Sequence, residues 1–412
     1  MFEKKNYDKE MLYITKRNKA HTCLYPNCKN RAIYSHAISK SISIDKIAEG
    51  GHVKIFNPIR YGNDKIPRFS DLGINDASAF NGFCHDHDSL FNNIDENEID
   101  NIRDLYFQIY RSLSCFYYYE KIGEVLYPDI DANEAFKTFV DAQSTKDTMN
   151  IDQEKLKSII IDTINKTNNI KNDELKKTKN EIDRIRRYFL NNIHELDEGK
   201  YNNRSLNEKG TELQTIKFND FDYVIFYYIT DFKIPVAINT MHNLNYCGRT
   251  FLFLYIVIPY ENSNIIIGVI EKDLPHEYYD RIISLIDDAF KDKLATLNFI
   301  ETLIITSPDD FYLKPSVIND MEENKLDFIL NDFMFLHEFL SFDKYFTQYD
   351  ASIFDELRRN IISENKNSYS THELDKIHMF PERESNEVRK VKMMDKIKNE
   401  NVIINSLNKG NN

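Results

Sequence analysis

Glycine and proline are scarce in this chain, and long apolar runs are absent. Among 412 residues there are 11 glycines and 10 prolines, which disfavours a protein of many short strands joined by tight turns and favours long helices. The longest apolar stretches, residues 251–259 and 265–270, are far shorter than the roughly 18 residues that a membrane span requires. The first ten residues are charged and lack the apolar core of a secretory signal. We therefore expect a cytoplasmic protein without a membrane segment.

Several catalytic motifs are also missing. The sequence has no glycine-rich phosphate loop, no Gly-x-Ser-x-Gly motif and no repeat at a solenoid period, so P-loop hydrolysis and hydrolysis by a serine on a nucleophile elbow have no support. The five cysteines do not predict a disulfide framework, because the cytoplasm keeps thiols reduced. Hydrophobic residues make up 42% and charged residues 29% of the chain. These fractions are typical of packed domains, and the length predicts about two to four of them.

Cysteine and histidine are concentrated near the N-terminus. The segments Cys23-x4-Cys28 and Cys84-x2-His87 have the spacing of two short turns, each of which can bring two ligands to one zinc ion. In an alternative register His85 is the fourth ligand and His87 is free for catalysis. The ion could serve only to fold a segment that is too polar to build its own core.

Basic residues are concentrated in the same region. Residues 1–70 contain 14 lysines and arginines against 6 acidic residues, a local charge of +8, whereas the whole chain carries −13. A polyanion such as nucleic acid could bind this segment, although the whole molecule would repel one. The alternative is that a small metal module has a basic solvated face. The residues that we expect to contact phosphates are Lys29, Arg31, Lys40, Lys54, Arg60, Lys65 and Arg68.

The order of polar residues around the two cysteine pairs resembles that of the HNH endonucleases, also called the ββα-metal or His-Me finger group. Ser35 and His36 end an expected strand over residues 31–38, and Asn81 precedes the second pair. His87 and Asp88 lie in the first turn of an expected helix that begins near residue 85. In that family a strand histidine is the general base, an asparagine orients it, and a residue on the helix binds the catalytic metal.

This resemblance covers about residues 20–95 and implies a treble-clef zinc module. It assigns His36 as the general base, Asn81 as the orienting residue and Asp88 as the ligand of a catalytic Mg²⁺ or Mn²⁺, with His85 or Ser35 assisting. Two of the family's residues are replaced, since Ser35 stands in place of an aspartate and Asp88 in place of a histidine. The spacing within the first cysteine pair is also two residues longer than in the family. The structural zinc would be held by Cys23, Cys28, Cys84 and His87.

The function implied by the resemblance is hydrolysis of phosphodiester bonds in nucleic acid, most simply DNA. The ordinary pKa of histidine is near 6.5, so His36 could accept a proton from the attacking water at neutral pH. The segments 35–40, 51–53 and 83–91 also resemble those of uncharacterised bacterial proteins of the anti-phage defence type. The alternative is a non-catalytic protein in which zinc folds the N-terminal module and the rest binds a protein or a small ligand. A metallohydrolase with another substrate would leave the basic segment unused.

The remaining sequence predicts an α+β protein. Helical periodicity covers residues 98–127, and it returns over residues 152–196 with an interruption at the asparagine-rich residues 165–172. We interpret the second segment as a helical arm or an antiparallel helical hairpin that packs within the chain, and a homodimer or partner-protein contact through it is the alternative. The apolar face of the arm comprises Ile182, Ile185, Phe189, Ile193 and Leu196.

Farther along the chain the period changes from helical to alternating. Runs rich in β-branched and aromatic residues predict an antiparallel sheet, followed by helices over residues 276–292 and 326–346. The expected strands cover residues 223–230, 234–241, 251–259 and 264–272. We therefore expect an HNH-like zinc module at 1–97, a helical region with a long arm at 98–199, an α+β domain at 200–360 and a polar, loosely ordered tail at 361–412.

Overall fold

The computed structural model of the protein divides into two compact units. Unit 1 comprises residues 1–37, 78–206 and 243–252, and unit 2 comprises residues 38–77, 207–242 and 253–412. The structure describes residues 21–61, 64–126, 133, 153–206, 209–210, 213–216, 223–246, 249–335, 349–364, 371–378 and 380–393.

Unit 1 contains the cysteine pairs and begins with a two-stranded ribbon. Strands β1 (Tyr34–His36) and β6 (Ala79–Asn81) pair antiparallel, with Ser35 opposite Phe80. Both the expected strand and the expected helix start near residue 85 are present. The ribbon leads into a series of helices, which are α2 (His85–Asp88), the 3-10 helix η2 (Ser89–Phe91), α3 (Asn92–Glu96) and α4 (Ile102–Leu126).

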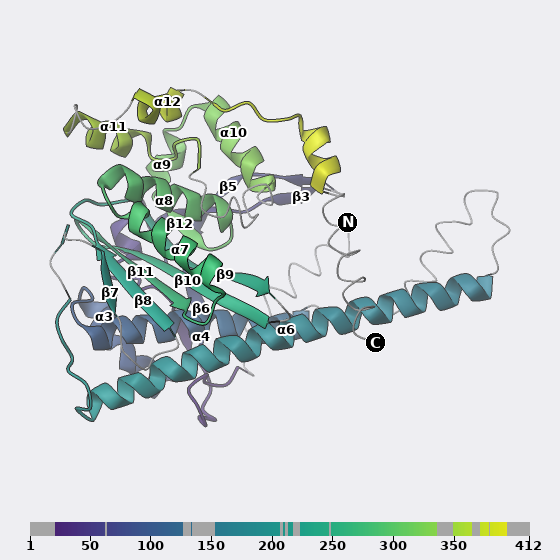
Figure 1. Ribbon diagram of the computed structural model, residues 1–412, viewed down its shortest axis with the longest axis horizontal. Helices are drawn as coiled ribbons and strands as arrows, with labels where there is room; N and C mark the ends of the chain where they lie inside the picture. Colours follow the sequence, from purple (N-terminus) through teal and green to yellow (C-terminus); the bar gives the residue numbers. More distant parts are fainter. Residues whose placement is uncertain are drawn as a thin grey trace. The chain divides into compact units, whose positions relative to one another are not determined.

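The expected arm is the helix α6 (Gln153–Asp197), which Figure 1 shows as one continuous helix. Its C-terminal half packs antiparallel to α4, because Arg103 near the start of α4 pairs with Asp197 at the end of α6 at 2.5 Å. All five residues of the expected apolar face are buried. The expected interruption at residues 165–172 is wrong. An asparagine costs a helix only a few tenths of a kcal/mol relative to the best helix formers, and the flanking turns continue the helix.

Unit 2 is built on an eight-stranded sheet with the order β5-β2-β12-β9-β10-β11-β8-β7. The neighbouring pairs whose register is described are antiparallel. The expected strands are present, and β8 and β10 are interior strands with buried residues along most of their length. The strands are β2 (His52–Phe56), β5 (Phe69–Gly73), β7 (Gln214–Ile216), β8 (Tyr223–Ile229), β9 (Val236–Tyr246), β10 (Arg249–Pro259), β11 (Asn264–Glu271) and β12 (Phe311–Leu313).

Residues 38–77 were expected within the N-terminal module, but the structure groups them with unit 2. The reason is strand pairing: β2 pairs with β12 through Lys54 and Leu313, and β5 continues the sheet beyond β2. The same segment also forms the 3-10 helix η1 (Ile44–Lys46) and a separate hairpin of β3 (Ile59–Tyr61) and β4 (Asp64–Ile66).

Two helices cover one face of the sheet in unit 2. α7 (His276–Ala289) was expected, whereas α8 (Lys293–Thr306) was not. Phe299 of α8 packs against Tyr255 of β10 with ring centroids 5.8 Å apart, and Phe290, just after α7, packs against Phe226 of β8 at 6.0 Å. Most residues of α8 are buried. A helix that is apolar all round has no amphipathic period, so its pattern does not distinguish it from a buried strand.

The C-terminal part of unit 2 corrects the expectation of a loosely ordered tail over residues 361–412. Residues 371–378 form a helix, and Lys376, Ile377 and Arg389 are buried. Residues 394–412 lie outside the described residues, as do 336–348, where the expected helix at 326–346 would end. The helices of this part are α9 (Pro315–Asn319), α10 (Glu323–Met334), α11 (Asp355–Glu364) and α12 (Thr371–His378).

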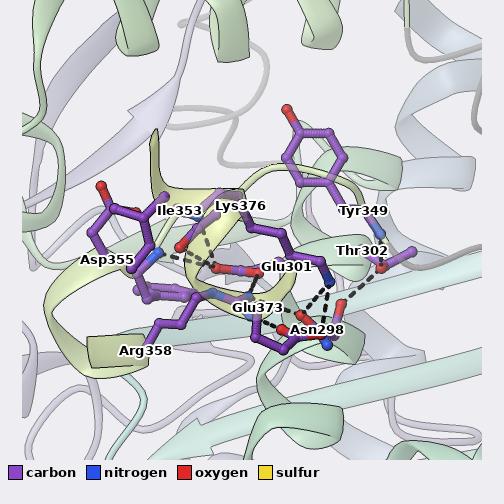
Figure 2. A network of polar contacts seen from close by, with 12 residues as sticks. Asn298, Glu301, Thr302, Tyr349, Ile353, Asp355, Arg358, Glu373 and Lys376 are labelled. Carbon is purple, nitrogen blue, oxygen red and sulfur yellow. Dashed lines mark hydrogen bonds and ion pairs between the residues drawn. The ribbon is translucent and has the colours of Figure 1, made fainter. Parts of the chain in front are cut away.

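A buried network of charged side chains connects α8 to α11 and α12 (Figure 2). The carboxylate of Glu301 accepts hydrogen bonds from the backbone N–H of Ile353 at 2.8 Å and from Arg358 at 2.5 Å. Arg358 also donates to Asn298 at 2.8 Å and pairs with Glu373. Ions removed from water need such partners, because an unpaired buried charge is strongly destabilising. Among the helices that the structure describes, none is long and apolar enough to span a membrane.

Candidate metal centre

The first cysteine pair lies on a tight turn. The backbone N–H of Cys28 donates to the carbonyl of Tyr25 at 3.1 Å, and the backbone N–H of Cys23 donates to the carbonyl of Asn30 at 2.8 Å. Asn27 has a φ of 61°, in the left-handed region that asparagine adopts more readily than most residues. This turn brings the two thiols to the same side of the chain.

The second pair lies at the start of α2. Cys84 is the N-cap residue of this helix, and the backbone N–H of His87 donates to the carbonyl of Cys84 at 3.0 Å. The two pairs are joined by backbone hydrogen bonds, from Leu24 to the carbonyl of Gly82 at 2.8 Å and from Ile33 to the carbonyl of Phe83 at 2.6 Å. The turn and the helix start are thereby held side by side.

Four ligand atoms converge at this junction. The atoms offered by Cys23, Cys28, Cys84 and His87 all lie within 4.8 Å of one another. The Nδ1 atom of His87 is 3.2 Å from Sγ of Cys84 and 3.5 Å from Sγ of Cys23, and the Sγ atoms of Cys28 and Cys84 are 3.9 Å apart. His85 is not part of the group, and its side chain is 90% exposed. The structure therefore places His87, not His85, with the three thiols.

These distances suit a tetrahedral zinc ion. Two sulfur ligands, each about 2.3 Å from zinc at the tetrahedral angle, lie about 3.8 Å apart, and a sulfur and a nitrogen lie about 3.5 Å apart. The separations of Cys28 from Cys84 and of His87 from Cys23 agree with these values. Three cysteines and a histidine are also a donor set that zinc commonly takes in structural sites. This group could therefore hold a metal ion such as zinc.

Burial changes the pKa of one thiol of this group. Burial raises the pKa of Cys23 to about 12, so without an ion this thiol stays protonated at neutral pH. A divalent ion reverses this preference, because the thiolate is the form that binds metal.

Side chains from α6 and the first turn support the group. The ring of Tyr25 stacks on the ring of His87 with centroids 3.9 Å apart and planes 9° from parallel. The hydroxyl of Tyr25 lies 3.2 Å from Nε2 of His194, and Arg186 donates to the carbonyl of Leu24 at 2.5 Å. These contacts orient the imidazole and the turn. Tyr25 was not among the expected site residues, although its position between Cys23 and Cys28 is a signal in the sequence.

Asp88 and Ser35 lie in direct contact beside the metal centre. The hydroxyl of Ser35 accepts a hydrogen bond from the backbone of Phe83 at 3.4 Å and hydrogen-bonds the carboxylate of Asp88. Burial raises the pKa of Asp88, whereas the hydrogen bond from Ser35 and the nearby charges of Arg111 and His36 lower it. His36 is therefore close enough to act electrostatically on Asp88.

The ribbon separates the other expected catalytic residues. Successive side chains of a strand point to opposite faces, so Ser35 and His36 leave β1 on different faces. Asn81 pairs with Tyr34 in the ribbon, and its side-chain amide donates to the hydroxyl of Tyr118 at 3.1 Å. The structure thus brings Ser35 and Asp88 into contact and places His36 within electrostatic range of Asp88. The side chain of Asn81 is held by its hydrogen bond to Tyr118 of α4.

The seven expected phosphate contacts are divided between the two units. Lys29 and Arg31 are exposed residues of unit 1. In unit 2, Lys54 pairs with Asp71 at 3.0 Å and Lys40 donates to Asn75 at 3.1 Å. Arg68 donates to the carbonyl of Asn57 at 3.4 Å, and the backbone register of the β3–β4 hairpin pairs position 60 (Arg60) with position 65 (Lys65).

Comparisons with protein-family models, with curated proteins and with solved structures found no match for this chain. The geometry of the metal centre and of the residues beside it is therefore the basis for a functional proposal.

Proposed function

We propose that unit 1 is a metal-dependent endonuclease module that hydrolyses phosphodiester bonds of nucleic acid. The observation that carries the proposal is the contact between Ser35 and Asp88, at the point where the Cys/His group joins β1 to the start of α2. The neighbouring His36 supplies a group that can act as a general base near neutral pH. This arrangement supports the treble-clef and HNH-like interpretation of the sequence.

In this proposal each residue has one role. His36 accepts the proton of the attacking water, and the carboxylate of Asp88 binds a divalent ion. One carboxylate is sufficient for Mg²⁺ or Mn²⁺ when phosphate oxygens and water complete the coordination. Such an ion supplies charge stabilisation at the scissile phosphate and the leaving oxygen. Zinc, held by the Cys/His group, keeps the strand and the helix together.

Two basic residues of unit 1 suit a nucleic-acid substrate. Lys29 directly follows Cys28, and Arg31 is two residues farther along. Both are exposed, so both are available to neutralise phosphates that flank the scissile bond. We expect their replacement to weaken binding in a salt-dependent way without changing the chemical step.

The decisive experiment is cleavage of supercoiled plasmid by the full-length protein loaded with zinc. Mg²⁺ or Mn²⁺ is added, and wild type is compared with His36→Ala and Asp88→Asn. We expect nicked and linear products from wild type and a loss of about 10²-fold or more in rate for His36→Ala, the usual contribution of a general base. His52→Ala is the matched control, because His52 is an exposed histidine of unit 2 that contacts its own loop at Gly50.

The nuclease proposal fails if wild type cleaves neither DNA nor RNA with either ion, or if His36→Ala is as active as wild type. Zinc content is measured on every variant, so a loss of cleavage is interpreted only where the structural ion is retained. Should cleavage be found, challenge of bacteria with phage tests the role in defence, which rests on the sequence resemblance.

A non-catalytic role is the second candidate, and one observation favours it. Ser35 stands where the HNH pattern has an aspartate, and a serine hydroxyl is a weaker ligand for a hard cation than a carboxylate. In that case zinc would only fold unit 1, which would then serve as a binding module. Wild-type protein with one zinc ion and no cleavage, but with salt-dependent binding of nucleic acid, would favour this second candidate.

A further inference from the structure

A cavity of about 140 Å³ lies in unit 2, beneath α7 and α8 and against the sheet. Its lining is mostly apolar. Four of the lining residues, Ala295, Phe299, Thr302 and Thr306, lie along α8 at spacings of four, three and four residues. A void of this size is close to the roughly 150 Å³ of an engineered apolar cavity that stays dry and binds benzene. The wall residues include Tyr255, Leu285, Ala295, Phe299, Thr302 and Thr306.

The cavity cannot close by a simple shift of α8, because hydrogen bonds to other parts of unit 2 hold the adjacent face of this helix in place. Asn298 and Glu301 belong to the buried charged network of Figure 2, and the hydroxyl of Thr302 accepts a hydrogen bond from the backbone of Tyr349 at 2.9 Å. At its N-terminus, Asp292 caps the helix through the backbone N–H of Ala295. A preformed pocket of this kind spares a ligand the cost of ordering its site.

The hydroxyl group of Thr306 gives the cavity a polar side. The hydroxyl of Thr306 donates to the carbonyl of Thr302 at 2.8 Å, so its oxygen keeps lone pairs that can accept a further hydrogen bond. Tyr255 is 1% exposed and its hydroxyl is inaccessible to solvent, so this residue contributes an apolar wall and not a second polar group.

The rim of the cavity indicates a neutral ligand. Asp288 and Lys291 belong to the lining and form an ion pair of 3.7 Å, with side chains that are 68% and 60% exposed. Their charges balance each other at the side that faces solvent. A neutral molecule can therefore enter without leaving either charge unpaired.

We infer that this cavity binds a small neutral aromatic molecule with one hydroxyl or N–H group, of the phenol class. The ring would occupy the apolar space between Leu285, Ala295 and Phe299. Its polar hydrogen would be donated to the hydroxyl oxygen of Thr306. This site lies in unit 2 and is independent of the nuclease proposal for unit 1.

Thermal unfolding of the full-length protein with phenol and with benzene tests the inference, together with saturation-transfer NMR as a direct measure of binding. We expect phenol at about 100 times its Kd to raise the Tm by on the order of 5 °C. Benzene should bind about tenfold more weakly, because it lacks the hydrogen bond. Thr306→Val should remove this difference between the two probes while leaving benzene binding unchanged.

Ala295→Leu fills the cavity and should weaken phenol binding at least tenfold. Ala289, the last residue of α7, also lines the cavity, and Ala289→Val is the second filling variant if the first does not fold. Ile304→Val is the matched control, since Ile304 is buried in α8 but does not line the cavity. The inference is overturned if neither probe binds wild type, or if a folded filling variant binds phenol as wild type does. Equal affinities for benzene and phenol would overturn the assignment of a polar ligand.

Discussion

The Sγ atoms of Cys28 and Cys84 lie 3.9 Å apart although 56 residues separate them in the chain. Most of the intervening chain, residues 38–77, groups with unit 2. The contact between the two thiols therefore closes unit 1 across a long excursion of the chain. A zinc ion at this point would stabilise the closure, because loop closure is the step that costs chain entropy.

Replacing one of these thiols should remove the ion and unfold the module. We expect Cys28→Ser to reduce zinc from one ion per chain to well below half, because a serine hydroxyl is a poor zinc ligand at neutral pH. Elemental analysis and circular dichroism measure the two effects. Cys115→Ser is the control: Cys115 is a buried cysteine of α4 that does not belong to the ligand group. Retention of full zinc by Cys28→Ser would contradict the assignment.

A second prediction concerns a glycine in the sheet of unit 2. Gly268 of β11 lies opposite Phe226 of β8 and Tyr255 of β10, and a Cβ atom at Gly268 would lie 2.0 Å from the ring of Phe226. Because Phe226 is buried and cannot move freely, we expect Gly268→Ala to lower the free energy of unfolding by about 1–3 kcal/mol or more. Urea denaturation measures this. Gly73→Ala is the control, since a Cβ there meets no atom within 4 Å, and equal effects of the two variants would refute the argument.

The sequence predicts the metal group well because its ligands come in two pairs, each held by a local turn. It also predicts the strands of unit 2, whose apolar runs are long and β-branched. It does not predict the place of residues 38–77, because nothing local indicates that Lys54 pairs with Leu313. The contact of Ser35 with Asp88 follows the pairing of β1 with β6, so it was only partly predictable. The buried charges of α8, such as Glu301, have partners distant in sequence and gave no signal.

Two buried titratable residues of unit 2 predict opposing effects of pH. Burial lowers the pKa of His242 to about 4 and raises the pKa of Asp310 to about 7. Both side chains belong to one polar cluster: Ser307 lies 3.0 Å from Nε2 of His242, and Thr240 donates to Asp310 at 3.1 Å. The depressed histidine pKa makes the fold less stable as pH falls from 6.5 to 4. The raised carboxyl pKa makes the fold less stable as pH rises from 3.8 to 7.

In wild type these two contributions largely cancel between pH 4 and 6.5. Asp310→Asn removes one of them, so we expect the variant to lose stability on acidification more steeply than wild type, by on the order of 3 kcal/mol over this range. Urea denaturation at pH 4.5, 5.5, 6.5 and 7.5 measures the slope. Asp320→Asn, at an exposed aspartate of the same unit, should leave it unchanged. Parallel pH profiles for wild type and Asp310→Asn would show that the pair does not titrate in this way.

The last prediction concerns the buried ion pair of Arg358 and Glu301, whose side chains are both fully buried (Figure 2). Arg358→Met leaves the carboxylate of Glu301 without its cation, and we expect a loss of roughly 3–5 kcal/mol in the free energy of unfolding. The same loss should not follow from Lys46→Met, because the pair of Lys46 with Glu261 at 3.1 Å is exposed and solvent screens its charges.

A double-mutant cycle separates the ion pair from the loss of packing. If the cost of Arg358→Met is mainly an unpaired buried charge, then Glu301→Gln in the same chain should recover part of it, so the double variant should be destabilised by less than the two single variants together. The backbone donors of Ile353 and Phe354 still find the amide oxygen of a glutamine at position 301, so they remain paired. Strict additivity would mean that Arg358 stabilises the helices through Asn298 and Glu373, and not through Glu301.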